Sequence, residues 1–146
     1  MFKNILIPTD GSELSQRAVR LAVDLAKLHQ SRITAIHVIP DYHLLIAYEG
    51  AFDPVTEERI EEEAKTRAET YLEFVRKTAE DTGIPCDTVC ETGDHPHAAI
   101  LKTADARKCD LIVMTSHGRK GLAAVLLGSE TRKVLTHGRI PVLVVR

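Results

Sequence analysis

Short apolar runs alternate along the whole chain with longer segments in which apolar residues recur at helical spacing. The five runs cover residues 3–8, 33–39, 86–91, 110–114 and 141–145. Strands that alternate with helices form βαβ units, and right-handed crossovers then give a doubly wound sheet. The sequence therefore predicts an α/β fold with three layers, in which a five-stranded parallel sheet has the flavodoxin-like or Rossmann-like arrangement.

The segments between the runs contain signals for helix starts and stops. Helical spacing extends over residues 12–29 and 53–82, and two further helices are expected to end near Lys108 and His137. Residues 41–55 are the least regular segment. We interpret this segment as a packed loop, with a lid or a partner surface as the alternative. Since no repeat or linker interrupts the pattern, we expect one domain over residues 1–146.

Length, composition and charge exclude several classes of protein. The chain has 146 residues, of which 44% are hydrophobic and 27% charged, as is ordinary for a globular chain with one core. Its formal charge of −2 gives no electrostatic case for nucleic acid or an acidic membrane surface. No apolar run approaches the roughly 20 residues that span a bilayer. The three cysteines form no disulfide framework, so we expect a reducing, cytoplasmic location.

The most informative single stretch covers residues 114–131. It begins where an apolar run stops and ends where a helix can begin, with Ser129 as the expected N-cap. Its glycines and cations are Gly118, Gly121, Gly128, Arg119 and Lys120. Glycine lets a backbone approach a ligand closely, and the N–H groups at a helix start attract phosphate. The stretch suits an anion-binding loop, and the alternative is a solvated loop before a capped helix.

The anion-binding interpretation is strengthened if the strand order of the sheet is 3-2-1-4-5. In doubly wound sheets, ligands bind beyond the carboxyl ends of the strands, where the strand order reverses. With the order 3-2-1-4-5, residues 8–11 and 115–118 leave neighbouring strands at that point. A mononucleotide fits such a crevice, with Asp10 toward ribose hydroxyls or toward Mg²⁺ beside phosphates. The alternative role of Asp10 is to form the turn. Val38 would offer a backbone group to an adenine edge.

Several more specific binding motifs are absent from the sequence or stand in the wrong structural context. The chain has no P-loop ending in Gly-Lys-Ser/Thr and no G-x-G-x-x-G fingerprint. Residues 118–121 match the GXXG loop of an RNA-binding KH domain, but they follow a strand, whereas that loop joins two helices. His95 and His97 lack a third metal ligand nearby, and Cys86 and Cys90 lie about 13 Å apart on one strand, too far to share zinc. We expect neither a protein-bound metal nor a catalytic residue.

These residues resemble the universal stress protein family, and the resemblance extends over the whole chain. Its signatures are residues 5–12, 37–39, 109–114 and 141–145. The most specific is the family's ATP-binding pattern, G-x2-G-x9-G-[ST], whose second half is matched by Gly118, nine further residues, and Gly128 followed by Ser129. Thr115 stands where the pattern has its first glycine. Its side chain would either narrow the approach to the nucleotide or contact the ligand through its hydroxyl.

The resemblance implies a homodimeric, stress-responsive regulatory protein that binds ATP with little or no turnover. In this family the last strand often pairs across the dimer axis, and residues 141–145 would form an apolar edge that needs covering. Other adenine nucleotides (AMP, ADP or cyclic AMP), slow Mg²⁺-dependent hydrolysis and a nucleotide-free dimerisation module remain alternatives, and the protein partner is not identified. The expected nucleotide contacts are Pro8, Thr9, Asp10, Val38, Met114, Thr115, Ser116, His117, Gly118, Arg119, Lys120, Gly121, Gly128, Ser129, Glu130 and Thr131.

Overall fold

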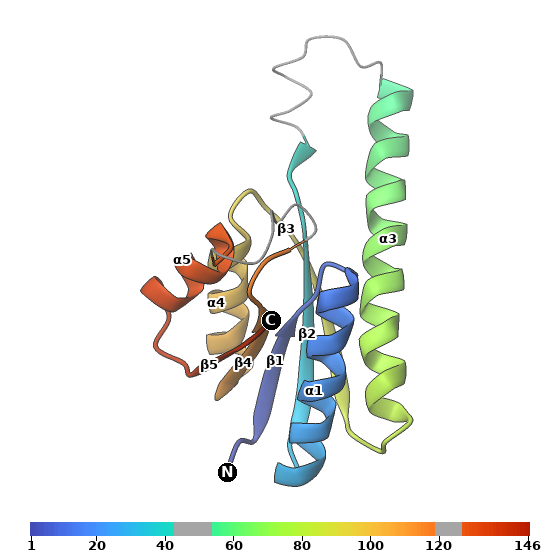
Figure 1. Cartoon of the computed structure of the whole chain (residues 1–146). Helices are drawn as coiled ribbons and strands as arrows, with labels where there is room; N and C mark the ends of the chain where they lie inside the picture. Colours follow the sequence, from blue (N-terminus) through green and yellow to red (C-terminus); the bar gives the residue numbers. More distant parts are fainter. Residues whose placement is uncertain (43–53, 119–126) are drawn as a thin grey trace.

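The computed structural model describes residues 1–42, 54–118 and 127–146 (Figure 1). Its five-stranded parallel sheet has the order β3-β2-β1-β4-β5, which confirms the predicted fold class and strand order. The strands are β1 (Asn4–Pro8), β2 (Arg32–Ile39), β3 (Cys86–Thr92), β4 (Leu111–Thr115) and β5 (Val142–Val145). The described helices are α1 (Glu13–His29), α3 (Pro54–Glu80), α4 (Pro96–Ala106) and α5 (Ser129–His137). The expected loop at 41–55 lies almost entirely outside the described residues.

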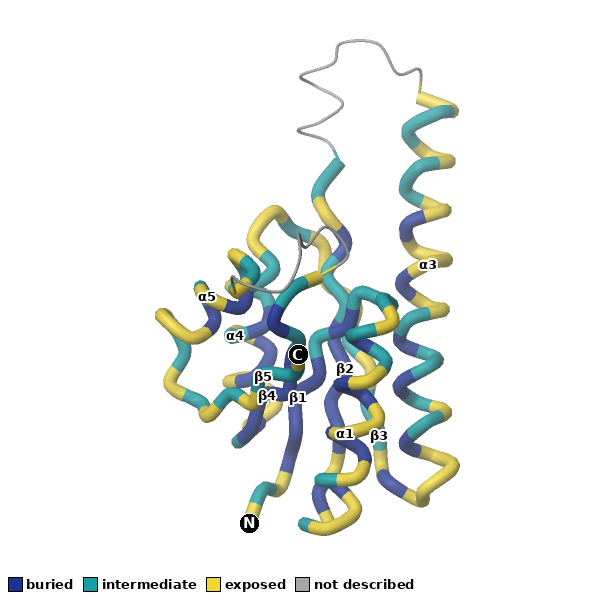
Figure 2. The backbone as a smooth tube through the Cα atoms, viewed as in Figure 1, coloured by how far each residue is buried: buried dark blue, intermediate teal, exposed yellow. Residues whose placement is uncertain are grey.

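The sheet separates two helical layers (Figure 1). Helices α1 and α3 cover one face, and α4 and α5 cover the other. Along β1, Ile5 and Ile7 join the hydrophobic cluster on the α1 side, whereas Leu6 joins the cluster on the α4 side. Because β1 and β4 are interior strands covered on both faces, their sequences are nearly continuous apolar runs. Figure 2 shows this buried centre between exposed helix surfaces.

The first helix begins at Glu13, within the segment 12–29 that was expected to be helical. The hydroxyl of Ser12 accepts a hydrogen bond from the amide of Ser15, so Ser12 is the N-cap of α1. One face of α1 then packs Ala18, Val19 and Ala22 into the core. In the described part of the chain, no helix is both long and apolar enough to cross a membrane.

Candidate functional site

Two loops meet at the carboxyl edge of the sheet, above β1 and β4. These strands are parallel neighbours, with Ile5 opposite Leu111 and Leu6 opposite Ile112. The loops that follow them come so close that a Cβ atom on Gly118 would lie 2.9 Å from Oδ2 of Asp10. The sheet therefore brings together the two strand exits that the sequence singled out, at the point where the strand order reverses.

Asp10 has a fixed orientation in the first of these loops. Its Oδ1 accepts a hydrogen bond from the amide of Ser12 at 3.0 Å, and Ser12 in turn caps α1. This Asx-type turn is the structural role that the sequence left open for Asp10. The other carboxylate oxygen, Oδ2, lies toward Gly118. Asp10 thus forms the turn and also presents an oxygen to the space between the two loops.

The start of α5 is tied directly to the end of β4. The amide of Gly128 donates to the carbonyl of Ser116 at 2.6 Å, and the hydroxyl of Thr131 donates to the carbonyl of Thr115 at 2.8 Å. The N-cap is Gly128, so the prediction of Ser129 as N-cap was wrong by one residue. The cause is the close approach of the loop, because a Cβ on residue 128 would lie only 3.1 Å from the Ser116 carbonyl. Ser129 is consequently the first helical residue, and the first turn of α5, whose N–H groups have no partner within the helix, begins beside the end of β4.

The backbone of Val38 is directed into the same space. The amide of Thr9 donates to the carbonyl of Ile36, which faces β1, whereas the Ile39 carbonyl accepts from Gly93 on the opposite side. Because strand residues alternate, the peptide groups of Val38 face the β1 side, beyond the last paired residue of β1 at Pro8. The Val38 side chain packs against the core under α4. The Val38 side chain is half-buried, and the backbone is the part of this residue that faces the end of β1.

The other expected contact residues differ in their exposure. Thr9, Met114 and Ser116 are buried, and the hydroxyl of Ser116 lies 3.0 Å from Nδ1 of the half-buried His117. Pro8 is half-buried at the end of β1. The expected phosphate contacts Arg119, Lys120 and Gly121 lie outside the described residues.

Glu130 is directed toward α4. Its Oε2 accepts from the backbone amide and from Nδ1 of His97, at 2.8 and 3.0 Å, and its Oε1 accepts from Lys133 at 2.8 Å. The cap residue of α4, His95, makes no side-chain cap hydrogen bond, so Glu130 caps α4 from the neighbouring helix. Burial raises the pKa of Glu130, but the donors Lys133 and His97 outweigh it and hold the pKa below its ordinary value. This contact couples the start of α5 to α4.

Sequence reasoning assigned no role to His37 and Tyr71, which lie beneath the loop after β1. Nδ1 of His37 lies 2.7 Å from the Thr9 carbonyl, and the Tyr71 ring packs edge-on against the His37 ring with centroids 5.2 Å apart. The signals for His37 were its place in the family signature at residues 37–39 and a polar ring near the end of an otherwise apolar strand. Tyr71 lies within the helix expected over residues 53–82, and no other signal marked it.

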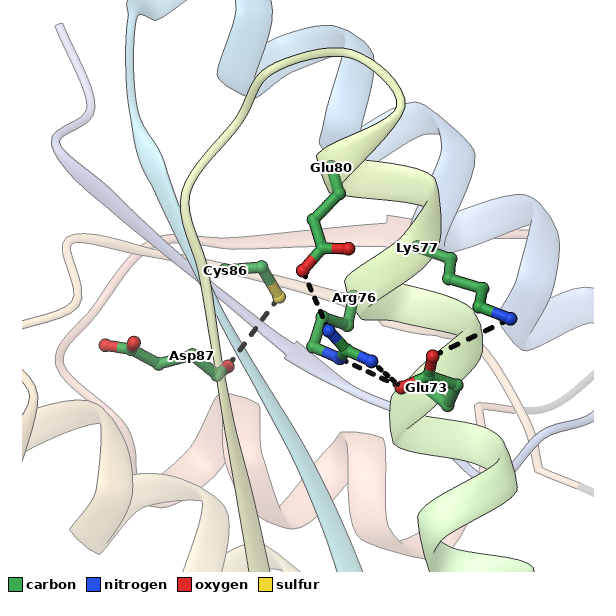
Figure 3. A network of polar contacts seen from close by, with 6 residues as sticks. All are labelled: Glu73, Arg76, Lys77, Glu80, Cys86 and Asp87. Carbon is green, nitrogen blue, oxygen red and sulfur yellow. Dashed lines mark hydrogen bonds and ion pairs between the residues drawn. The ribbon is translucent and has the colours of Figure 1, made fainter.

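A second hollow, of about 480 Å³, lies between α3 and the edge strand β3. Among the described residues that line it, the one cation, Arg76, is already engaged in ion pairs with Glu73 and Glu80 along α3 (Figure 3). The hydrogen bond from Arg76 lowers the pKa of Glu73. Among the described residues, no group of three or more His, Cys, Asp or Glu side chains is arranged to hold a metal ion. The carboxyl edge of β1 and β4 is therefore the better candidate site.

The fold and this crevice define a Rossmann-like α/β protein. The sequence profile of the universal stress protein family matches residues 1–146, and the chain belongs to that family. It is 35% identical to the universal stress protein MJ0531 of Methanocaldococcus jannaschii, over all of this chain and 83% of that protein. A solved structure of the hypothetical protein MJ0577 has a TM-score of 0.79 and 34% identity, covering 99% of this chain and 96% of the other.

Two further solved structures share the fold and are described with bound nucleotides. A universal stress protein in complex with cAMP has a TM-score of 0.71 and 23% identity, covering 99% of this chain and 97% of its own. A universal stress protein of Archaeoglobus fulgidus in complex with dAMP also has a TM-score of 0.71, with 18% identity and coverage of 99% and 98%. Because both sequence identities are below 25%, these two structures show that the fold is shared with this chain and nothing further.

Proposed function

We propose that the crevice at the carboxyl edge of β1 and β4 binds an adenine mononucleotide, with ATP as the principal ligand. The observation that carries the proposal is the meeting of Asp10 with Gly118, beside a helix start that Gly128 holds against the end of β4. Each element suits one part of a nucleotide. The Val38 peptide groups suit an adenine edge, the Asp10 carboxylate suits ribose hydroxyls, and the N–H groups at the start of α5 suit phosphates.

Position 115 is compatible with this proposal. Thr115 is the last residue of β4, pairs with Val145, and has a negative φ, so its backbone does not require glycine. Its carbonyl is occupied by the Thr131 hydroxyl, which fixes the strand end to α5. Threonine at position 115, in place of the first glycine of the family pattern, is therefore compatible with the backbone and the hydrogen bonds of the described residues around it. The complexes with cAMP and dAMP add that this fold accommodates adenine nucleotides in other proteins.

We further propose that the protein acts as a homodimeric regulator in the cytoplasm, with little or no hydrolysis of the nucleotide. β5 is an edge strand that pairs with β4 alone in the sheet, and Leu143 on it is 37% exposed. An apolar edge strand is a template for pairing with a second strand, and a second copy of the chain would cover it. Cys86, Cys90 and Cys109 are free thiols, as expected in a reducing compartment.

The test is calorimetric titration of nucleotide-free protein with ATP and Mg²⁺. Gly118→Ala is the informative variant, because among the described residues its new Cβ meets the end of the Asp10 side chain and no backbone atom. Gly93→Ala is the matched control, since no described atom lies within 4 Å of a Cβ at that position. We expect micromolar binding by the wild type and by Gly93→Ala, and at least tenfold weaker binding by Gly118→Ala.

A different outcome would favour another function. If the wild type binds no adenine nucleotide, the proposal is wrong and the nucleotide-free dimerisation module takes its place. If Gly118→Ala binds as tightly as the wild type, the nucleotide lies elsewhere. Sedimentation of the wild type and of Leu143→Lys tests the dimer separately, because a charge on the edge strand opposes pairing between copies.

A further inference from the structure

We propose that His37 is a positioning residue of the nucleotide site, which holds the Thr9 carbonyl and thereby sets the direction of Asp10. This role rests on the proposed nucleotide site and goes beyond it, because it places a determinant of affinity on β2, beneath the binding loop.

The contact joins a side chain of β2 to the first residue after β1. Nδ1 of His37 lies 2.7 Å from the carbonyl oxygen of Thr9, a short hydrogen bond. Thr9 is held at two further points, since its amide donates to Ile36 and its hydroxyl lies 2.8 Å from the hydroxyl of Ser15. The buried Thr9 is therefore fixed through its amide, its carbonyl and its side chain, one residue before Asp10.

The contact also fixes the proton on the imidazole. A carbonyl oxygen can only accept a hydrogen bond, so Nδ1 of His37 must carry a hydrogen and donate it. The neutral ring is then the Nδ1–H tautomer, with Nε2 unprotonated. This tautomer can be identified by spectroscopy. The contact with the Thr9 carbonyl requires it, whereas a His37 ring that only filled space would not.

Through Tyr71, helix α3 packs against the His37 imidazole and against Gly11 in the loop that follows Thr9. The Tyr71 ring lies edge-on to His37 at an interplanar angle of 73°. The same ring occupies the space that a Cβ on Gly11 would need, and Gly11 has the positive φ of +73°. Tyr71 thus supports the imidazole from one side and the loop from the other. The imidazole, the loop and the helix form one packed unit.

The consequence for the site follows from the order of residues along the loop. Once the Thr9 carbonyl is fixed, the peptide between Thr9 and Asp10 has one orientation, and the Ser12 amide then holds Oδ1 of Asp10. Oδ2 lies toward Gly118. Removing the His37 donor would leave the Thr9 carbonyl without this partner and allow the peptide to rotate. Asp10 would then lose its alignment with the second loop.

The experiment compares His37→Leu with His37→Asn. Asn places an N–H donor where Nδ1 stands, whereas Leu fills similar space without a donor. We expect His37→Leu to bind ATP roughly tenfold more weakly, the effect of one hydrogen bond lost to a buried carbonyl, and His37→Asn to bind within about threefold of the wild type. His95→Leu is the matched control, because His95 makes no side-chain cap bond, and its affinity should stay unchanged.

Two NMR measurements on nucleotide-free protein accompany the titrations. Imidazole ¹⁵N shifts of the wild type should show His37 as the Nδ1–H tautomer at pH 8, and the amide signals of residues 9–12 should move in His37→Leu and return in His37→Asn. Unchanged ATP affinity in His37→Leu, or an Nε2–H tautomer, would overturn the role of His37. Wild-type protein that binds no adenine nucleotide would instead overturn the proposed function and the role of His37 with it.

Discussion

Gly11 and Gly83 provide a matched pair that measures how tightly Tyr71 packs beneath the loop after β1. Both glycines have a positive φ, +73° and +75°. A Cβ on Gly83 would have nothing within 4 Å, whereas a Cβ on Gly11 would overlap the ring of Tyr71. Substitution by alanine therefore imposes the same backbone strain at both positions and a steric clash at only one.

The expected losses of stability follow from the backbone strain and the steric clash. A left-handed conformation costs an L residue roughly 1–2 kcal/mol, partly offset by the lower entropy of the unfolded chain, so Gly83→Ala should lose about 1 kcal/mol. Overpacking adds roughly 1–3 kcal/mol, so Gly11→Ala should lose about 2–4 kcal/mol. In a Tyr71→Ala background the clash disappears, and the cost of Gly11→Ala should fall to about 1 kcal/mol.

Urea unfolding of the wild type, the single variants and the double variant gives the free energy of unfolding in each case. The ATP affinity should fall in Gly11→Ala and stay unchanged in Gly83→Ala, because only Gly11 lies in the loop that carries Asp10. Equal losses of stability at the two glycines, or a loss at Gly11 that persists without the Tyr71 ring, would refute the packing of Tyr71 against this loop.

Three further variants or measurements test other contacts. Glu130→Gln should lower the melting temperature at pH 7, and the difference from the wild type should shrink as the pH falls below about 4.5. The folded pKa of Glu130 lies below this ordinary value, so its stabilisation is present above the ordinary value and is lost as the pH falls through the folded pKa. Thr131→Val should cost about 1 kcal/mol in urea unfolding through the lost bond to the Thr115 carbonyl; an unchanged value would refute that tie. Iodoacetamide at pH 8 should modify the exposed Cys90 before Cys86, since burial, with Asp87 and Glu80 nearby, raises the pKa of Cys86 to about 11; the reverse order would contradict this difference.

The sequence was sufficient for the fold because local patterns determine it. Interior strands such as β1 are buried on both faces, which makes them continuous apolar runs, and Ser12 marks the start of α1 by its own side chain. The predicted reversal of strand order then placed the loops after β1 and β4 together. These predictions depend on residue type and spacing along the chain, and they were confirmed.

What the sequence could not show depends on contacts between distant segments. The N-cap of α5 falls on Gly128 because the Ser116 carbonyl approaches it from the end of β4. Glu130 caps a helix that begins more than thirty residues earlier in the chain, at Pro96. The contact of His37 with Thr9 likewise joins residues 28 positions apart. No local sequence pattern predicts these contacts between distant residues, so the structure was needed to find them.

The most direct test of the proposed nucleotide site is to map it on ¹⁵N-labelled protein with ATP and Mg²⁺. The account predicts that the amide signals of Asp10, Val38, Gly118 and Ser129 move together and saturate with one affinity, since all four lie at the carboxyl edge of the sheet. Signals at the opposite edge, such as that of Asn4, should stay in place. Shifts confined to that opposite edge or to the hollow beside Arg76, or no shifts at saturating ATP, would contradict the proposed site.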